Sequence, residues 1–320
     1  MNPKRKILVI RLSSLGDIIL TVPVIRALKN KYPEAEIDFL LKKSYKDVYA
    51  NNPNLSAVFL YEEIDDDFFE RNYDLIIDLQ NNLRSKKIRN KFTAEIFYFK
   101  KPAVKKFLLV NFKINKLRPI KSIPRRYSEC VPGLSLDNLG AELFIPSDVQ
   151  PKLKPEGKYI GFCPGSRHFT KMWLPEYFVE LGKLLSDAGF TVVLFGGKDD
   201  KDICADISRQ IPAAINLSDD DNLLQTAKDI SLCKGVVCND SGLMHAAAAV
   251  QTPVIAIFGS TVREFGFAPY GVKNLILENN SLSCRPCSHI GKSKCPKGHF
   301  ECMKSITPRL VFNELKKFLL

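Results

Sequence analysis

Short apolar runs alternate with amphipathic stretches along the first half of the chain. Residues 7–10 form an apolar, mostly β-branched run, typical of a strand that is buried on both faces of a parallel sheet. A turn with serine and glycine follows at 13–16, and apolar positions at helical spacing predict a helix that begins near Asp17. Further runs predict strands at 37–41, 58–61, 75–79 and 96–99 and a helix at 83–92. Strands separated by helical segments predict a mostly parallel, doubly wound sheet.

The alternation restarts after a stretch rich in proline, serine and lysine at 146–157, which we interpret as a linker between domains. The later pattern predicts strands at 159–163, 191–195, 235–238 and 254–258, and helices at 175–188, 200–211, 222–231, 243–249 and 308–320. The predicted fold class is therefore α/β, with two consecutive βαβ domains, residues 1–150 and 151–305, and a cleft between them.

The composition is that of a globular protein with sizeable cores. The 320 residues are 45% hydrophobic, and the length is sufficient for two domains. The first apolar run is interrupted by Arg11 and lacks a small-residue cleavage site, and no apolar stretch reaches the roughly 18 residues of a membrane-spanning helix. We therefore expect a soluble, cytoplasmic protein.

The net charge of +12 is concentrated in one segment. Residues 84–126 contain 15 Lys and Arg and one acid, Glu95, so they carry +14 while the rest of the chain sums to −2. Apolar and aromatic residues are interleaved with these charges. Such a segment suits an acidic acceptor, an anionic membrane surface or a nucleic acid, although a solvated basic face has the same composition. No recognised nucleic-acid-binding motif accompanies the charge, so no nucleic acid is expected as a partner.

Asp17 is the first candidate for chemistry, because it follows the first predicted strand at the start of a helix. The turn after such a strand lies at the ligand-binding edge of an open α/β sheet. An aspartate there can cap the helix, since it accepts N–H bonds and interacts favourably with the helix dipole. It can equally serve as a catalytic base. The local sequence leaves both interpretations open.

Polar residues also follow three predicted strands of the second half. The stretch with Gly165, Ser166, Arg167 and Lys171 suits a diphosphate, because backbone N–H groups and hydroxyls hold the oxygens while cations neutralise the charge, although it could be a structural loop. Gly196 and Gly197 precede Asp199 and Asp200, which could contact a ribose or cap a helix. The third set follows strand 235–238 and consists of Asp240, Ser241, Gly242 and His245; the histidine could be structural. These groups suit transfer from a nucleotide-bound donor to a separate acceptor.

Five motifs in order resemble glycosyltransferase family 9, the heptosyltransferases of the lipopolysaccharide inner core, over essentially the whole chain. They are Ser13-Ser14-Leu15-Gly16-Asp17-Ile18 with Thr21-Val22-Pro23, Asp78-Leu79-Gln80 with Leu83-Arg84-Ser85, Pro164-Gly165-Ser166 with Lys171-Met172-Trp173-Leu174-Pro175-Glu176, Asn239-Asp240-Ser241-Gly242-Leu243-Met244-His245, and Phe258-Gly259-Ser260-Thr261. One departure is Asn81-Asn82, where many members have Gly or His, and it touches the acceptor side.

The resemblance implies a GT-B fold, in which two Rossmann-like domains face each other across a cleft. Residues 1–150 would then bind the acceptor, residues 151–305 the nucleotide sugar, and the helix in 306–320 would cross back to the first domain. The implied reaction is an inverting, metal-independent transfer of heptose from ADP-L-glycero-β-D-manno-heptose, with no cofactor required for catalysis.

The family pattern also implies residue roles. Asp17 is the general base, and Lys171 meets the negative charge of the departing ADP. The donor-binding residues are Gly165, Ser166, Arg167, Lys171, Asp240, Ser241, Gly242 and His245. Arg84, Lys86 and Lys87, at the start of the basic segment, are expected to bind an anionic, lipid-anchored saccharide acceptor, with peripheral contact to an anionic membrane at the inner face of the inner membrane. The rival functions are a nucleotide-sugar epimerase of the same fold and a basic nucleic-acid-binding protein.

Four cysteines lie within 19 residues near the end of the chain, namely Cys284, Cys287, Cys295 and Cys302. Four thiolates at this spacing are compatible with a structural tetrahedral zinc site. Free or redox-labile thiols are the alternative, and disulfides are disfavoured in a cytosolic protein.

Overall fold

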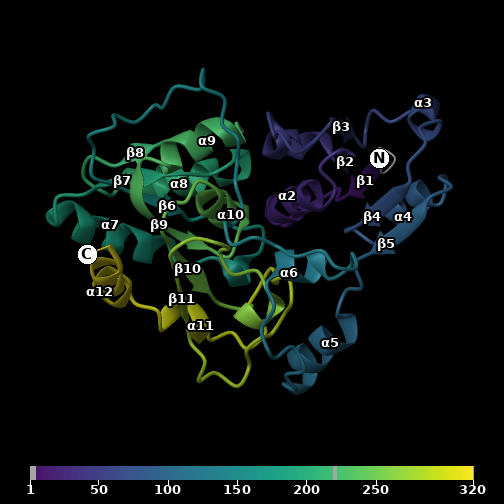
Figure 1. Ribbon diagram of the computed structural model, residues 1–320. Coiled ribbons are helices and arrows are strands. Elements are labelled where there is room, and N and C mark those ends of the chain that lie inside the picture. Colours follow the sequence, from purple (N-terminus) through teal and green to yellow (C-terminus); the bar gives the residue numbers. More distant parts are fainter. Residues whose placement is uncertain (1–4, 219–221, 320) are drawn as a thin grey trace. The chain divides into compact units, whose positions relative to one another are not determined.

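The computed structural model describes residues 5–218 and 222–319, which form two compact units (Figure 1). The first unit consists of the described residues up to Pro102 together with Ser122–Pro146, and the second of Ala103–Lys121 together with the described residues from Ser147 onward. No helix within the described ranges is long and apolar enough to cross a membrane.

The first unit is built on a parallel sheet of five strands in the order β3-β2-β1-β4-β5. The strands are β1 (Lys6–Ile10), β2 (Glu36–Leu41), β3 (Ala57–Leu60), β4 (Leu75–Asp78) and β5 (Glu95–Tyr98). Its helices are α1 (Leu15–Ile19), α2 (Val22–Lys31), α3 (Asp66–Phe69), α4 (Leu83–Arg89) and α6 (Ile123–Ser128), with a 3-10 helix, η1 (Lys43–Tyr49). Because the strand order reverses between β1 and β4, the loops that follow these two strands flank the switch point, where ligands bind in open α/β sheets.

The helix predicted to begin near Asp17 is divided into α1 and α2. Pro23 lies in the first turn of α2, where its missing N–H costs nothing. The hydroxyl of Thr21 donates to the carbonyl of Ile18 at 2.6 Å and accommodates the break between the helices.

The second unit contains a parallel sheet of six strands in the order β11-β10-β9-β6-β7-β8. They are β6 (Tyr159–Cys163), β7 (Thr191–Leu194), β8 (Ile215–Asn216), β9 (Cys233–Asn239), β10 (Val254–Phe258) and β11 (Asn274–Glu278). The helices are α5 (Ala103–Phe112), α7 (Pro175–Asp187), α8 (Lys201–Ser208), α9 (Leu223–Ile230), α10 (Gly242–Ala249), α11 (Glu301–Lys304) and α12 (Pro308–Leu319), with short 3-10 turns η2 (Phe169–Lys171), η3 (Lys198–Asp200) and η4 (Arg263–Phe265). Here the strand order reverses between β6 and β9.

The core of the second unit lies on both faces of its sheet. Successive residues of the central strands, such as Val236 and Val237, belong to different hydrophobic clusters because neighbouring side chains of a strand point to opposite faces. One cluster includes side chains of α7, α8 and α12, and the other includes side chains of α9 and α10. The layers therefore have the doubly wound arrangement that the sequence predicted.

Two segments lie elsewhere than the sequence indicated. The terminal helix α12 was expected to cross back to the first domain, but Val311 and Leu315 are buried in the cluster that includes α7, within the second unit. Residue 320, the end of that predicted helix, lies outside the described residues. Residues 103–121 also belong to the second unit, although the expected first domain ran from 1 to 150. The last of the three junctions between the units lies between Pro146 and Ser147, inside the predicted linker.

Candidate functional site

Asp17 lies in the first turn of α1, directly after β1, with a polar partner on each carboxylate oxygen. Its Oδ2 accepts hydrogen bonds from the Ser14 hydroxyl at 2.9 Å and from the Ser14 backbone N–H at 3.4 Å, and the second of these caps the start of the helix. Its Oδ1 lies 2.7 Å from an Arg11 guanidinium nitrogen and 3.3 Å from the Tyr127 hydroxyl. The capping interpretation is therefore correct for one oxygen, while a cation and a hydroxyl hold the other at the switch point of the sheet.

The partners of Asp17 are themselves fixed by burial. Arg11 is buried, and its other terminal nitrogen donates to the Leu79 carbonyl at 2.7 Å, which links the ends of β1 and β4. Burial acts to lower the pKa of Arg11, but Tyr127 and Asp17 outweigh it and the pKa is raised. Burial raises the pKa of the Tyr127 phenol well above its usual value, so its hydroxyl remains a donor at physiological pH.

The end of β4 is held by a buried carboxylate. Asp78 accepts hydrogen bonds from the backbone N–H of Asn81 at 2.7 Å and from the Ser85 hydroxyl at 2.9 Å, and Arg89 lies 2.9 Å from it. This network anchors α4 with one of its basic residues turned inward. The predicted acceptor residues are exposed on the same helix: Arg84, Lys86 and Lys87.

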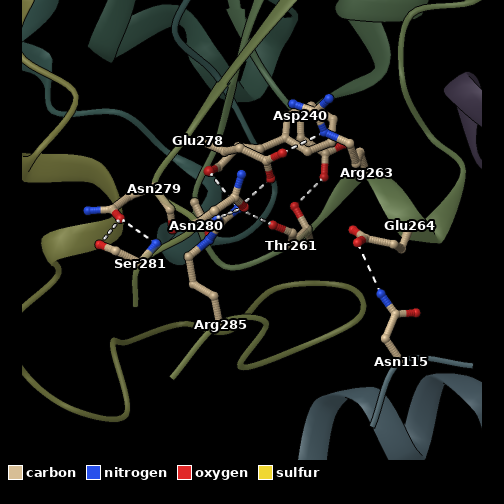
Figure 2. Close-up of polar contacts among 12 residues, drawn as sticks. Asn115, Asp240, Thr261, Arg263, Glu264, Glu278, Asn279, Asn280, Ser281 and Arg285 are labelled. Carbon is tan, nitrogen blue, oxygen red and sulfur yellow. Dashed lines mark hydrogen bonds and ion pairs between the residues drawn. The ribbon is translucent and has the colours of Figure 1, made fainter. Parts of the chain in front are cut away.

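In the second unit, the predicted donor residues come together at the ends of adjacent strands. Lys171, in η2 after β6, lies with its ammonium 2.8 Å from Asp240 Oδ2 at the end of β9. The same oxygen accepts from the hydroxyl of Thr261, after β10, at 2.7 Å. Figure 2 shows the contact between Thr261 and Asp240. Since β10, β9 and β6 are neighbours in the sheet, the strand order brings these three side chains to one edge.

Asn239 fixes the loop that contains Lys171, and it was not singled out from the sequence as a site residue. This asparagine is buried; its Oδ1 accepts from the backbone N–H of Trp173 at 2.9 Å, and its Nδ2 donates to the carbonyl of Pro164 at 2.7 Å. It thereby ties both ends of the 164–173 loop to β9. A buried polar residue at the end of an apolar strand was the signal that could have identified it.

Gly165 is required by close packing. A Cβ atom at this position would overlap the carboxyl group of Asp200. Asp200 accepts from the backbone N–H of Gly197 at 3.1 Å, which is the predicted capping contact, and burial raises the pKa of this carboxyl. Contact of Asp199 or Asp200 with a ribose stays a prediction.

The remaining predicted donor residues lie in two places, around the first half of α10 and in the 164–173 loop. Ser241 is the N-cap residue of α10 and Gly242 is its first residue. Both are half-buried, whereas His245 is buried with its ring centre 6.4 Å from that of Phe267. In the loop after β6, Ser166 is half-buried and Arg167 is exposed.

A buried arginine organises the loop after β10, as Figure 2 shows. Arg285 donates to the carbonyls of Gly259 at 2.6 Å and Thr261 at 2.8 Å, and pairs with Glu278 of β11 at 2.9 Å. Glu278 also binds Arg263 at 2.6 Å. Sequence reasoning treated this part of the chain as a cysteine cluster and missed the arginine within it.

The cysteine cluster does not form a metal-binding set in this structure. Residues 5–218 and 222–319 contain no group of three or more His, Cys, Asp or Glu side chains placed to hold a metal ion. Cys284 Sγ lies 3.9 Å from His299 Nε2, and burial raises the pKa of the Cys302 thiol to about 11. The zinc site at Cys284, Cys287, Cys295 and Cys302 stays a prediction.

Two doubly wound parallel-sheet domains, each with polar side chains at its switch point, are the architecture of GT-B glycosyltransferases. Solved structures share it along the chain. A glycosyl transferase family 9 structure from Veillonella parvula has a TM-score of 0.78 at 19% identity and covers 100% of this chain and 98% of its own. The ADP-heptose lps heptosyltransferase II of E. coli has a TM-score of 0.72 at 25% identity and covers 98% of both chains.

The family model of glycosyltransferase family 9 (heptosyltransferase) matches residues 134–297, and the chain belongs to this family. Lipopolysaccharide heptosyltransferase 2 of Salmonella typhimurium is 28% identical over 98% of both proteins. The Escherichia coli protein of the same name is 27% identical over 98% of this chain and 99% of its own. The predicted family, fold and enzyme class, a glycosyltransferase, are confirmed.

Proposed function

We propose that the protein transfers heptose from ADP-L-glycero-β-D-manno-heptose to the lipopolysaccharide inner core by an inverting, metal-independent reaction. The observation that carries this proposal is the similarity to lipopolysaccharide heptosyltransferase 2, which extends over nearly the full length of both chains. The solved structure named as an ADP-heptose lps heptosyltransferase supports the nature of the donor.

The second unit supplies the donor side of this proposal. Lys171 and Arg167 would neutralise the diphosphate, while Gly165, Ser166, Ser241 and Gly242 offer backbone N–H groups and hydroxyls. Asp240 orients Lys171 through their 2.8 Å contact. As the bond between the anomeric carbon and the diphosphate oxygen breaks, ADP gains negative charge, and the lysine stabilises it. Losing one such stabilising group typically costs roughly 3–4 kcal/mol of barrier.

The first unit supplies the base. An acceptor hydroxyl attacks the anomeric carbon on the side opposite to the leaving ADP, and its proton passes to the carboxylate of Asp17. A positioned base of this kind contributes roughly 10²–10⁴ in rate. Arg11 and the Tyr127 hydroxyl hold one carboxylate oxygen in place, at 2.7 and 3.3 Å. Catalysis in this scheme requires no cofactor.

The acceptor is an anionic, lipid-anchored saccharide. Arg84, Lys86 and Lys87 are exposed together on α4 and provide cations for its acidic groups. We place the enzyme in the cytoplasm, with peripheral contact to the inner face of the inner membrane, because an acceptor with a lipid anchor is presented at a bilayer surface.

Turnover of ADP-heptose against a panel of truncated core saccharides tests this function. We expect release of ADP only when the acceptor ends in a sugar that accepts heptose, with a product one heptose heavier. Conversion of the donor without any acceptor would indicate an epimerase instead. The anomeric configuration of the product, determined by NMR, tests inversion separately.

A further inference from the structure

The segment 103–121 is held on the second unit by its inner side. Leu109 of α5 and Leu117 are buried in one cluster with Val262 and Phe265. The Lys106 ammonium lies 5.7 Å from the centre of the Phe265 ring, within the range of a cation–π contact. An inner face with these contacts accounts for the attachment of the segment, but not for the composition of its outer face.

Polar contacts fix the second half of the segment. The Lys113 ammonium donates to the carbonyl of Pro286 at 2.7 Å and to that of Cys284 at 3.2 Å. The side-chain amide of Asn115 donates to Glu264 at 3.0 Å, which Figure 2 shows. Apolar and polar contacts therefore attach both halves of the segment to the second unit.

That outer face is apolar. Of the eleven large hydrophobic side chains exposed among the described residues, five lie in this segment. They are Val104 (72% exposed), Phe107 (58%), Phe112 (61%), Ile114 (46%) and Ile120 (45%). The rings of Phe107 and Phe112 contact each other with centres 5.9 Å apart. A helix with apolar residues on both its inner and outer faces is ordinarily buried, so this outer face is suited to a second apolar surface.

The charge of the segment determines which apolar surface fits. Residues 103–121 contain six Lys and Arg and no acid. Lys105 and Lys116 are exposed beside the apolar side chains. Phenylalanine and branched aliphatic side chains bordered by cations suit the boundary between anionic lipid headgroups and acyl chains. The apolar side chains contact the acyl chains there, and the cations contact the headgroups.

We propose that the outer face of 103–121 docks on an anionic lipid bilayer, with Val104, Phe107 and Phe112 inserted at the headgroup boundary. The proposal rests on the proposed function, because a lipid-anchored acceptor brings the enzyme to such a surface. It assigns the membrane contact to the second unit rather than to the basic residues of α4.

Flotation of the full-length protein with vesicles tests the docking. Vesicles of equal parts phosphatidylcholine and phosphatidylglycerol are compared with phosphatidylcholine alone. We expect binding to the mixed vesicles, a loss of at least about tenfold in partitioning for the double variant Phe107→Ser/Phe112→Ser, and about fivefold for Lys105→Gln. Leu139→Ser, at an exposed site (68%) in the first unit, is the matched control and keeps wild-type binding.

The outcomes separate docking from catalysis. Because the substituted rings are exposed, the double variant should retain its circular dichroism spectrum and its turnover of a deacylated, water-soluble acceptor, while turnover of an acceptor embedded in mixed vesicles falls. Failure of the wild type to bind the mixed vesicles overturns the proposal. The proposal is also overturned if the double variant binds the mixed vesicles as well as the wild type does, or if the wild type binds only when acceptor glycolipid is present. A change in self-association in place of vesicle binding overturns it too. If the wild type itself does not turn over the soluble acceptor, that result counts against the proposed function instead.

Discussion

Replacing Lys171 by methionine perturbs the pair with Asp240 in a way that separates folding from ligand binding. The two side chains are 15% and 9% exposed and their charged atoms are 2.8 Å apart. Removing one partner of a buried pair leaves the other charge uncompensated, which lowers the free energy of unfolding by about 3–5 kcal/mol when burial is complete. Since some exposure remains, we take about 3 kcal/mol, which lowers the Tm of a domain of roughly 150–250 residues by about 6–12 °C.

The double variant Lys171→Met/Asp240→Asn removes both charges, and the amide can still accept from the Thr261 hydroxyl. Its melting transition should therefore return to within about 3 °C of the wild type, because no unpaired charge is left. Its affinity for ADP should not return. Loss of a charge-assisted contact with the diphosphate is worth about 2 kcal/mol, or roughly thirtyfold in Kd.

Differential scanning calorimetry of the second unit's transition measures the stability, and titration calorimetry with ADP measures the affinity. If Lys171→Met melts within about 1 °C of the wild type, the pair does not contribute as the burial argument requires. If the double variant recovers ADP affinity together with stability, Lys171 acts only as the partner of Asp240 and is not a phosphate ligand.

Three further changes test other parts of the structure. Arg11→Met should lower kcat by about tenfold or more while KM for the donor is unchanged in steady-state assays, because Arg11 positions Asp17 and not the nucleotide. Gly165→Ala should weaken ADP binding in the same titration, and the added change Asp200→Gly, which removes the overlapping carboxyl group, should partly restore it. Burial raises the pKa of Asp38 in the folded state, so ionisation of this carboxyl disfavours folding. Asp38→Asn should therefore raise the Tm at pH 7. The gain in Tm should vanish in melts at a pH below the pKa of Asp38 in both the folded and the unfolded state.

Much of the fold could be predicted because each buried strand leaves a short apolar run in the sequence. The runs at 7–10 and 159–163, for example, correspond to β1 and β6. Strand order leaves no such local mark. The contact between Lys171 and Asp240 depends on β6 lying beside β9. The hydrophobic pattern of each strand does not reveal this, because it would be the same whichever strand lay next to it.

The attachment of 103–121 to the second unit could not be predicted for a related reason. Its basic residues indicate a solvated face, and its anchors, Leu109 and Leu117, pack with Val262 and Phe265, far away in the sequence. Arg285 was missed in the same way, because its partners, the carbonyls after β10, are backbone groups that a motif does not reveal.

The most direct test of the account is Asp17→Asn, with transfer and donor binding measured on the same preparation. Asparagine keeps the size of the side chain but cannot take the acceptor's proton, so we expect transfer to fall by roughly 10²–10⁴ while Kd for ADP stays within about twofold of the wild type. Asp67→Asn, at an exposed carboxylate of α3 in the same unit, is the matched control. Near-normal transfer by Asp17→Asn would contradict the assignment of this carboxylate as the base.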